Sequence, residues 1–317
     1  MRRVFLAGFG LLLGLLPAAA AGLPATVTDA TGRSVTVTDA SRIVALGGTV
    51  TEILYALGLE AQVAAVDVTS TFPARASSKP SVGYVRALSA EGVLALGPTV
   101  ILATEDAGPA EVVAVLEKAS VPFIVVPKAH DAAGVAATIR FVAEAAGVPE
   151  KGAALADAVA ADLAAFAAMR AALPSRKKAV FVLGVSGGAP MVAGDGTGAA
   201  DIFALAGIDN GLTGLAGYKP ASDEAVIAAA PDAIVLMAER NHALTDDGIL
   251  GLPAFAGTPA AEGRRIFRES GTYLLNFGPR TAHAARDLAA AVYPEANLPA
   301  LPPRPWTTDA AVAKAAP

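Results

Sequence analysis

One phrase that reads as a helix followed by a strand occurs twice in the sequence and limits the folds open to this chain. SAEGVLALGPTVIL (89–102) and SDEAVIAAAPDAIV (222–235) share six of fourteen residues at a constant offset of 133. Each copy reads as a serine N-cap, an acidic first turn, a short apolar helix, a proline turn and a buried strand. The repeat predicts two related α/β halves, although any βα protein that reuses the same cap would also produce it.

Short apolar strands alternate with helical segments on both sides of an Ala-rich middle region. Strands are expected at 43–46, 62–68, 99–104, 122–126, 177–184, 190–194, 232–237 and 264–267, and helices near 48–58, 109–119, 198–206, 222–230 and 280–292. This alternation is typical of βαβ units with a mostly parallel sheet. We therefore predict two Rossmann-like lobes, joined by a long rigid helix in the strand-free region between them.

The two ends of the sequence differ from the rest. Residues 1–21 combine two arginines, an apolar run and small residues, which is typical of a secretory signal peptide, whereas a membrane anchor would need about 20 apolar residues. We expect an N-terminal lobe at 22–148, a connecting helix at 149–173 and a C-terminal lobe at 174–317, with a Pro-rich tail lying extended on the surface. The sequence has no cysteine, so we predict a soluble periplasmic protein that is not a lipoprotein.

Charge and composition exclude some partners. The net charge is −5 and no run of lysine and arginine occurs, so nucleic acid is not an expected partner. Hydrophobic residues make up 54% of the chain but aromatic residues only 5%, which favours helices packed on buried parallel strands. Two such lobes joined by a helix predict a cleft that captures a small molecule.

Three segments carry a resemblance to a known family. RIVALGGTVTEILYALGL (42–59), GYVRALSAEGVLALGPTVIL (83–102) and GYKPASDEAVIAAAPDAIVLM (217–237) resemble the haem-binding periplasmic proteins of ABC importers. These belong to the helical-backbone class, class III, which also includes vitamin B12 and ferric-siderophore binders. The resemblance implies a binding protein, not an enzyme, that carries haem b to a permease and ATPase complex in the inner membrane. A ferric siderophore or a corrinoid is the alternative ligand, the corrinoid disfavoured because Trp306 in the tail is the only tryptophan.

The resemblance also implies roles for individual residues. Tyr84 would be the axial ligand of the haem iron, and its phenolate would suit ferric iron because it is a hard, anionic oxygen donor. Arg86 and Arg240 would lie beside that ligand, while Tyr218 in the second half would stack on or hydrogen bond to haem without coordinating iron. The simpler alternatives are that Tyr84 only packs on a ligand and that Arg86 is a solvated surface charge.

Other charged residues near the tyrosine segments are candidates for further contacts. The propionates of haem could bind Arg75, Lys79 or Arg86. In this transporter class one acidic residue on each lobe pairs with permease arginines, and Glu91 and Glu224 occupy the matching places in the two repeats. Complementing the helix dipole is the alternative role for both carboxylates.

The histidines do not form a metal motif. His130, His242 and His283 fit no HExxH or His-x-His spacing. Some relatives hold a second haem through a histidine in the segment that reads VFVLGVSGGAP here. That segment, 180–190, contains none, so one haem per protein is expected.

One motif supports a distant alternative, a secreted serine hydrolase. GVSGG (184–188) matches G-x-S-x-G after an expected strand, as a nucleophile elbow would. An elbow needs a helix directly after the serine, but Pro190 and an expected strand follow. A hydrolase is therefore disfavoured.

Overall fold

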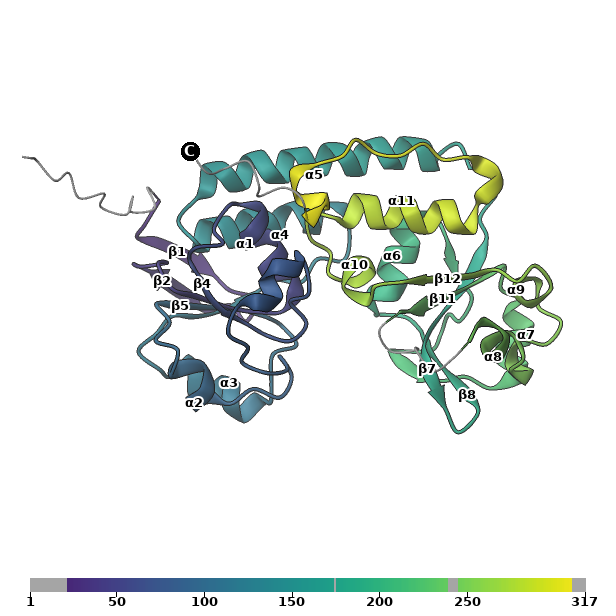
Figure 1. Ribbon diagram of the computed structural model, residues 1–317, viewed down its shortest axis with the longest axis horizontal. Helices are drawn as coiled ribbons and strands as arrows, with labels where there is room; N and C mark the ends of the chain where they lie inside the picture. The colour runs from purple at the N-terminus through teal and green to yellow at the C-terminus, as the bar shows by residue number, and fades with distance from the viewer. Residues whose placement is uncertain (1–21, 174, 239–244, 310–317) are drawn as a thin grey trace, which may run out of the picture.

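Two α/β halves lie side by side beneath a pair of long helices (Figure 1). The computed structural model describes residues 22–173, 175–238 and 245–309. The expected signal peptide at 1–21 lies outside these residues. Helices α5 (Pro149–Arg170) and α11 (Thr281–Val292) run along the top of the molecule, and α5 extends over both halves. The α/β class with a helical connection, predicted from the sequence, is confirmed.

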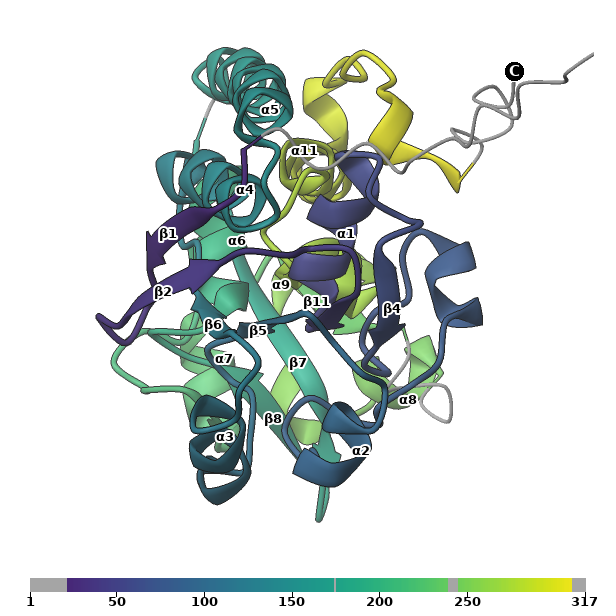
Figure 2. The same ribbon diagram turned by 90° about the vertical axis from the view of Figure 1, so that its left-hand side faces the viewer.

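The N-terminal half is built on a four-stranded parallel sheet between two layers of helices (Figure 2). The sheet order is β4 (Val63–Val66), β3 (Ile43–Leu46), β5 (Val100–Thr104) and β6 (Phe123–Val126), with a separate antiparallel hairpin of β1 (Ala25–Thr28) and β2 (Ser34–Val37). Helices α1 (Gly48–Ala56) and α4 (Ala132–Ala145) cover one face, and α2 (Ala90–Leu94) and α3 (Ala110–Glu117) cover the other.

The C-terminal half has a six-stranded mixed sheet. Its path is β10 (Tyr218–Pro220), β8 (Ala189–Ala193), β7 (Lys178–Ser186), β11 (Ala233–Met237) and β12 (Ile266–Glu269), and β9 (Asp209–Asn210) also pairs with β7. Strands β9, β7, β11 and β12 are parallel, whereas β8 and β10 are antiparallel to their neighbours.

The remaining elements of the two halves are α6 (Gly198–Ala206), α7 (Asp223–Ala229), α8 (Asp246–Leu250), α9 (Pro259–Glu262), α10 (Gly271–Leu275) and the short 3-10 turns η1 (Ala74–Ser78), η2 (Pro253–Phe255), η3 (Pro294–Ala296) and η4 (Pro305–Thr307).

Burial on both faces explains why the first sheet reads as continuous apolar runs. In β3, Val44 and Leu46 contact the cluster beneath α2 and α3, while Ile43 and Ala45 contact the cluster beneath α1 and α4. Successive residues of a strand point to opposite faces, so a strand covered on both sides must be apolar throughout. The chain then turns into α1 at Gly47, where φ is 108° and an added Cβ would lie 2.5 Å from Thr104.

Helix α5 is part of the hydrophobic core. By length and composition it is, in the described residues, the one helix that could cross a membrane. Its Leu155, Leu163 and Phe166 are buried in a cluster that continues into both halves. These contacts are those of a core helix in a folded protein and not of a lipid-facing span.

The structure confirms the cap in each copy of the repeat. The Ser89 hydroxyl accepts a hydrogen bond from the Gly92 N–H at the start of α2, and the Ser222 hydroxyl accepts one from Ala225 at the start of α7. The Pro-rich tail is extended as expected. It is also anchored, because Leu301 is buried and the Arg304 guanidinium binds Asp162 of α5 at 2.6 Å.

The nucleophile-elbow hypothesis is wrong for this chain. Ser186 ends β7 and pairs with Ala189 of β8 across a turn at Gly187 and Gly188. An antiparallel strand and not a helix follows the serine, so the backbone there is a hairpin. In the described residues that directly follow Ser186, the chain forms β8 and begins no helix.

Candidate functional site

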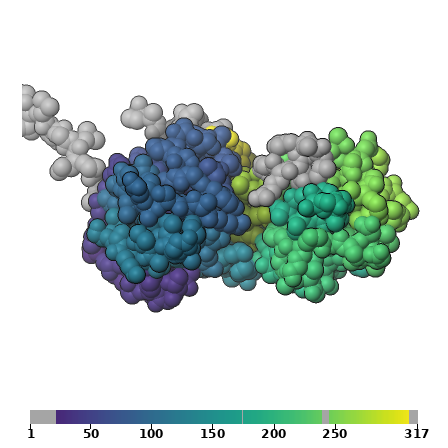
Figure 3. All heavy atoms as spheres, turned by 90° about the horizontal axis from the view of Figure 1, so that it is seen from below, coloured from purple at the N-terminus to yellow at the C-terminus, as the bar shows by residue number. Residues whose placement is uncertain are grey.

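A groove of about 730 Å³ lies between the two halves. Figure 3 shows the molecule from below, with the two halves separated and the yellow-green C-terminal segments at the bottom of the hollow between them. The N-terminal wall consists largely of loops that follow the carboxyl ends of β3, β4, β5 and β6. This edge is where open parallel sheets bind their ligands.

Tyr84 lines this groove from the loop between β4 and α2. Its loop is held against the sheet because the Val68 N–H donates to the Gly83 carbonyl at 2.9 Å. The Tyr84 side chain is half-buried. The guanidinium carbon of Arg86 lies 5.9 Å from the centre of its ring. One wall of the groove therefore presents a phenol with a cation beside it.

The Arg86 guanidinium is fixed by Asp106, which follows β5. Its Nη2 and Nε donate to Asp106 Oδ2 at 2.6 and 2.8 Å, and the Thr104 hydroxyl donates to Oδ1 at 2.7 Å. Burial acts to lower the pKa of Arg86, but the hydrogen bond and negative charge of Asp106 outweigh it and raise that pKa. Burial would likewise raise the pKa of Asp106, yet hydrogen bonds from Thr104 and Arg86 hold it below its usual range. Both groups are thus charged and paired.

Tyr218 lines the groove from the opposite half, at the start of β10. Thr197, the N-cap residue of α6, lines the groove on the same side. Burial raises the pKa of Tyr218, and the Ala199 backbone, the positive charge of Arg86 and the Thr197 side chain offset only part of that effect. Because Arg86 and Tyr218 line the same groove, side chains of the two halves face one space.

The structure thus brings together three of the four groove residues predicted from the sequence. Tyr84, Arg86 and Tyr218 all line it. Arg240, the fourth, lies outside the described residues, as does His242.

Two cations proposed for propionate binding are occupied elsewhere. Arg75 Nε donates to Glu60 Oε2 at 2.7 Å, and Lys79 Nζ donates to the Glu60 carbonyl at 2.8 Å. Neither is among the described residues that line the groove. Nearness in sequence to Tyr84 therefore does not bring these two candidates to the groove, because both side chains bind Glu60 instead.

Glu91 and Glu224 lie apart from the groove, one in the first turn of α2 and one in the first turn of α7. Both are exposed. Hydrogen bonds from its own backbone N–H and from Ser222 lower the pKa of Glu224. The two carboxylates are therefore surface groups on opposite halves.

The two described histidines make structural contacts. His130 Nδ1 lies 2.6 Å from Asp201 Oδ2, which links the loop after β6 to α6 across the two halves, and His283 Nε2 lies 3.1 Å from the Pro302 carbonyl. No cluster of three or more histidine, aspartate and glutamate side chains that could hold a metal ion occurs in the described part of the chain.

Sequence reasoning missed several residues that line the groove. Asp106, Lys128 and Asn276 line the groove but belong to no motif. The position of Asp106 and Lys128 directly after β5 and β6 was the available signal, because carboxyl ends of parallel strands meet at one edge.

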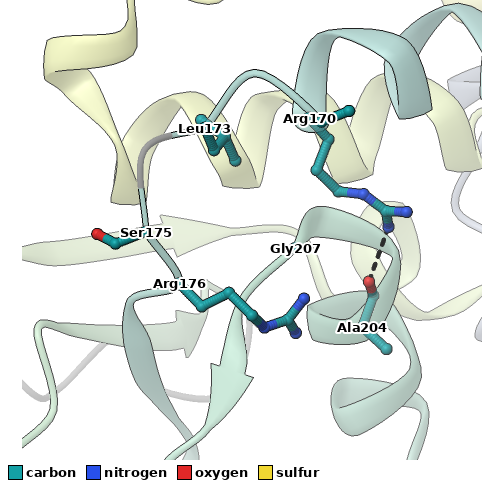
Figure 4. A pocket seen from close by; sticks show the side chains of 7 residues that line it. Arg170, Leu173, Ser175, Arg176, Ala204 and Gly207 are labelled. Atoms are coloured by element: carbon teal, nitrogen blue, oxygen red, sulfur yellow. Dashed lines mark hydrogen bonds between the residues drawn. The ribbon is translucent and has the colours of Figure 1, made fainter.

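A second, smaller cavity of about 290 Å³ lies beside the end of α5 (Figure 4). Arg170 donates to the Ala204 carbonyl at 2.9 Å, closing the carboxyl end of α6. Arg176 pairs with Asp209 at 2.5 Å. Both guanidinium groups bind other parts of the protein, so neither is available to bind a ligand in this cavity.

Comparisons with known proteins agree with this geometry. The sequence matches the periplasmic binding protein family over residues 43–269. The structure is similar to the periplasmic haem-binding protein RhuT from Roseiflexus sp. RS-1 in its apo form, with 37% identity, a TM-score of 0.77, and coverage of 81% of this chain and 100% of that one. It is also similar to the periplasmic haem-binding protein BhuT in complex with two haems, with 35% identity, a TM-score of 0.76, and coverage of 80% and 98%.

One relative found by sequence similarity is described as a lipoprotein. The uncharacterized ABC transporter substrate-binding lipoprotein YvrC of Bacillus subtilis is 25% identical over 281 residues, covering 86% of each chain. All these comparisons extend over most of both halves.

Proposed function

This chain belongs to the periplasmic binding protein family, and we propose that the ligand it captures between its two halves is haem. The observation that carries the proposal is Tyr84 beside Arg86 on the wall of a groove of about 730 Å³. Small-molecule sites in proteins usually measure about 300–1,000 Å³, so this groove is of suitable size. The similarity to RhuT and BhuT, both periplasmic haem-binding proteins, supports the same ligand.

We assign Tyr84 as the axial ligand to ferric iron. A phenolate is a hard, anionic donor, and haem iron is held by tyrosine in other proteins. The Arg86 guanidinium lies beside this ligand, 5.9 Å from the centre of its ring. Tyr218 contacts the bound ligand from the other half. We propose that Arg240 also contributes to haem binding, as the resemblance implies.

The protein delivers its haem to an ABC importer in the inner membrane. We propose that Glu91 and Glu224 pair with arginines of the permease, supported by their exposure on opposite halves. Two ion pairs at a fixed separation orient the partner and raise the association rate more than they add affinity. Capture and release of haem exchange only an axial ligand of the iron and leave the haem itself chemically unchanged, and we propose that the chain is not an enzyme.

The protein is periplasmic, and we propose that it is soluble there and not a lipoprotein, unlike YvrC. The absence of cysteine supports this, because a lipid is attached to a cleavage-site cysteine in lipoproteins. We further propose a signal peptide at 1–21, lobes at 22–148 and 174–317 and a connecting helix at 149–173. The position of α5, between the two sheets in the chain, supports that division.

Titration of the purified protein with hemin tests the function. We expect a shift of the Soret band and a ferric–phenolate charge-transfer band that both saturate at one equivalent. BhuT holds two haems, so a break at two equivalents would correct the stoichiometry. Cyanocobalamin and a ferric siderophore, added in parallel, should not compete with hemin. Competition by either, or an unchanged hemin spectrum, would contradict the assignment.

A further inference from the structure

Only some of the charged side chains that line the groove in the described residues are paired with an opposite charge. Four charged residues occur among the described residues that line it, namely Arg86, Glu105, Asp106 and Lys128. Arg86 and Asp106 neutralise each other through a contact of 2.6 Å. Glu105 Oε1 accepts a hydrogen bond from the backbone N–H of Lys128 at 2.8 Å. The Lys128 ammonium itself makes no ion pair and no hydrogen bond with any part of the chain that the structure describes.

The position of Lys128 is fixed by the sheet. Lys128 follows β6, and Glu105 and Asp106 follow β5, its parallel neighbour. Adjacent strands are about 4.8 Å apart, so Lys128 and the Arg86–Asp106 pair lie close together on the same wall. The hydrogen bond to Glu105 holds the Lys128 backbone at this place while the side chain stays exposed.

We infer that Lys128 binds a carboxylate of the ligand. This rests on the proposed function, in which the ligand is a haem with two propionate groups. An ammonium paired with a carboxylate forms a charge-assisted hydrogen bond of about 2.7–2.9 Å. Arg86 is already paired with Asp106 and lies beside Tyr84, the proposed iron ligand, so carboxylate recognition falls to a different cation, Lys128. Lys128 thereby selects an anionic tetrapyrrole over a neutral one.

The test compares hemin with hemin dimethyl ester, in which both carboxylates are masked, on four proteins. These are the unsubstituted protein, Lys128→Met, Lys128→Arg and, as a matched control, Lys118→Met, which removes an exposed charge at the end of α3 outside the groove lining. Lys128→Met should weaken hemin binding about tenfold. It should leave ester binding and the ferric–phenolate band unchanged. Lys128→Arg should restore most of the affinity for hemin, and Lys118→Met should change neither ligand.

The outcomes separate this inference from the function on which it rests. Equal hemin affinity in Lys128→Met and the unsubstituted protein would overturn the role of Lys128, as would an equal loss for hemin and its ester. Unchanged ester binding shows that the variant is folded. If the unsubstituted protein binds neither hemin nor its ester, the proposed function fails and this inference fails with it.

Discussion

Glu52 of α1 and Arg280, which directly precedes α11, form a buried ion pair that links the two halves of the molecule. Arg280 Nη2 donates to Glu52 Oε1 at 2.6 Å and its Nε donates to Oε2 at 2.9 Å. The Asn276 amide also donates to Oε1, at 2.8 Å, and the guanidinium carbon lies 3.5 Å from the centre of the Phe72 ring. The carboxylate and the guanidinium thus bind each other across the junction of the two halves, next to Asn276 of the groove lining.

Removing one partner of this pair should destabilise the whole protein. Arg280→Met leaves the Glu52 carboxylate buried without its counter-charge, a change that costs about 3–5 kcal/mol in free energy of unfolding. The matched control is Arg140→Met, because Arg140 pairs with Asp157 on the surface, where the loss should be below about 1 kcal/mol. Urea unfolding of both variants measures the difference. Similar losses in free energy of unfolding for the two variants would show that the buried pair stabilises the protein no more than a surface pair does.

The two groove tyrosines should respond differently to the same substitution. Tyr84→Phe removes the hydroxyl that we assign to iron, so the hemin complex should lose its ferric–phenolate charge-transfer band. Tyr218→Phe should keep that band and lose only part of the affinity, because Tyr218 lines the groove from the opposite half and is not the residue assigned to iron. Absorption spectra of the two hemin complexes show whether each retains the charge-transfer band. A band that survives in Tyr84→Phe and disappears in Tyr218→Phe would reverse the assignment.

The Arg86–Asp106 pair predicts a pH dependence of stability. The pKa of Asp106 is lowered in the folded protein. Its contribution is therefore fully present above the unfolded carboxyl pKa of about 3.9 and is lost as pH falls through the lower folded value. Asp106→Asn should be slightly less stable than the unsubstituted protein at pH 7, by less than about 1 kcal/mol because the pair is partly exposed. The melting temperatures of Asp106→Asn and the unsubstituted protein, measured from pH 7 to pH 3, should become more similar as the pH falls. A difference that increases towards pH 3 would contradict this prediction.

The sequence was sufficient for elements whose burial leaves a clear pattern. The all-apolar β3 and the serine-capped α2 and α7 were predicted because the core and the caps constrain those residues directly. The hairpin of β1 and β2 was missed, since its short Thr-rich strands belong to a small two-stranded sheet. Strand β10 was also missed, because GYKP contains glycine and proline, which are weak strand formers tolerated at a sheet edge.

The groove was only partly predictable for a different physical reason. Tyr84 and Tyr218 were found because a resemblance and a repeat drew attention to them, and the facing of the two halves brings them together. Asp106 and Lys128 belong to loops that become neighbours of Tyr84 only when β4, β3, β5 and β6 align in register. Proximity in sequence pointed instead to Arg75, whose side chain binds Glu60.

The docking carboxylates give a prediction that separates function from folding. Glu91→Lys and Glu224→Lys place a cation in the first turn of α2 and α7, where it opposes the helix dipole at a cost of about 0.3–1 kcal/mol. Glu150→Lys makes the same change in the first turn of α5 and serves as the matched control. All three variants should therefore show a similar small loss of stability and unchanged hemin binding.

Only Glu91→Lys and Glu224→Lys should impair transport. Each single reversal should slow association with the permease reconstituted in proteoliposomes, and the double reversal should reduce haem uptake most strongly, because both lobes then repel the arginines they are proposed to meet. The defect should depend on ionic strength, since added salt screens exposed charges. Uptake by the double variant equal to that of Glu150→Lys would assign Glu91 and Glu224 to helix stabilisation alone.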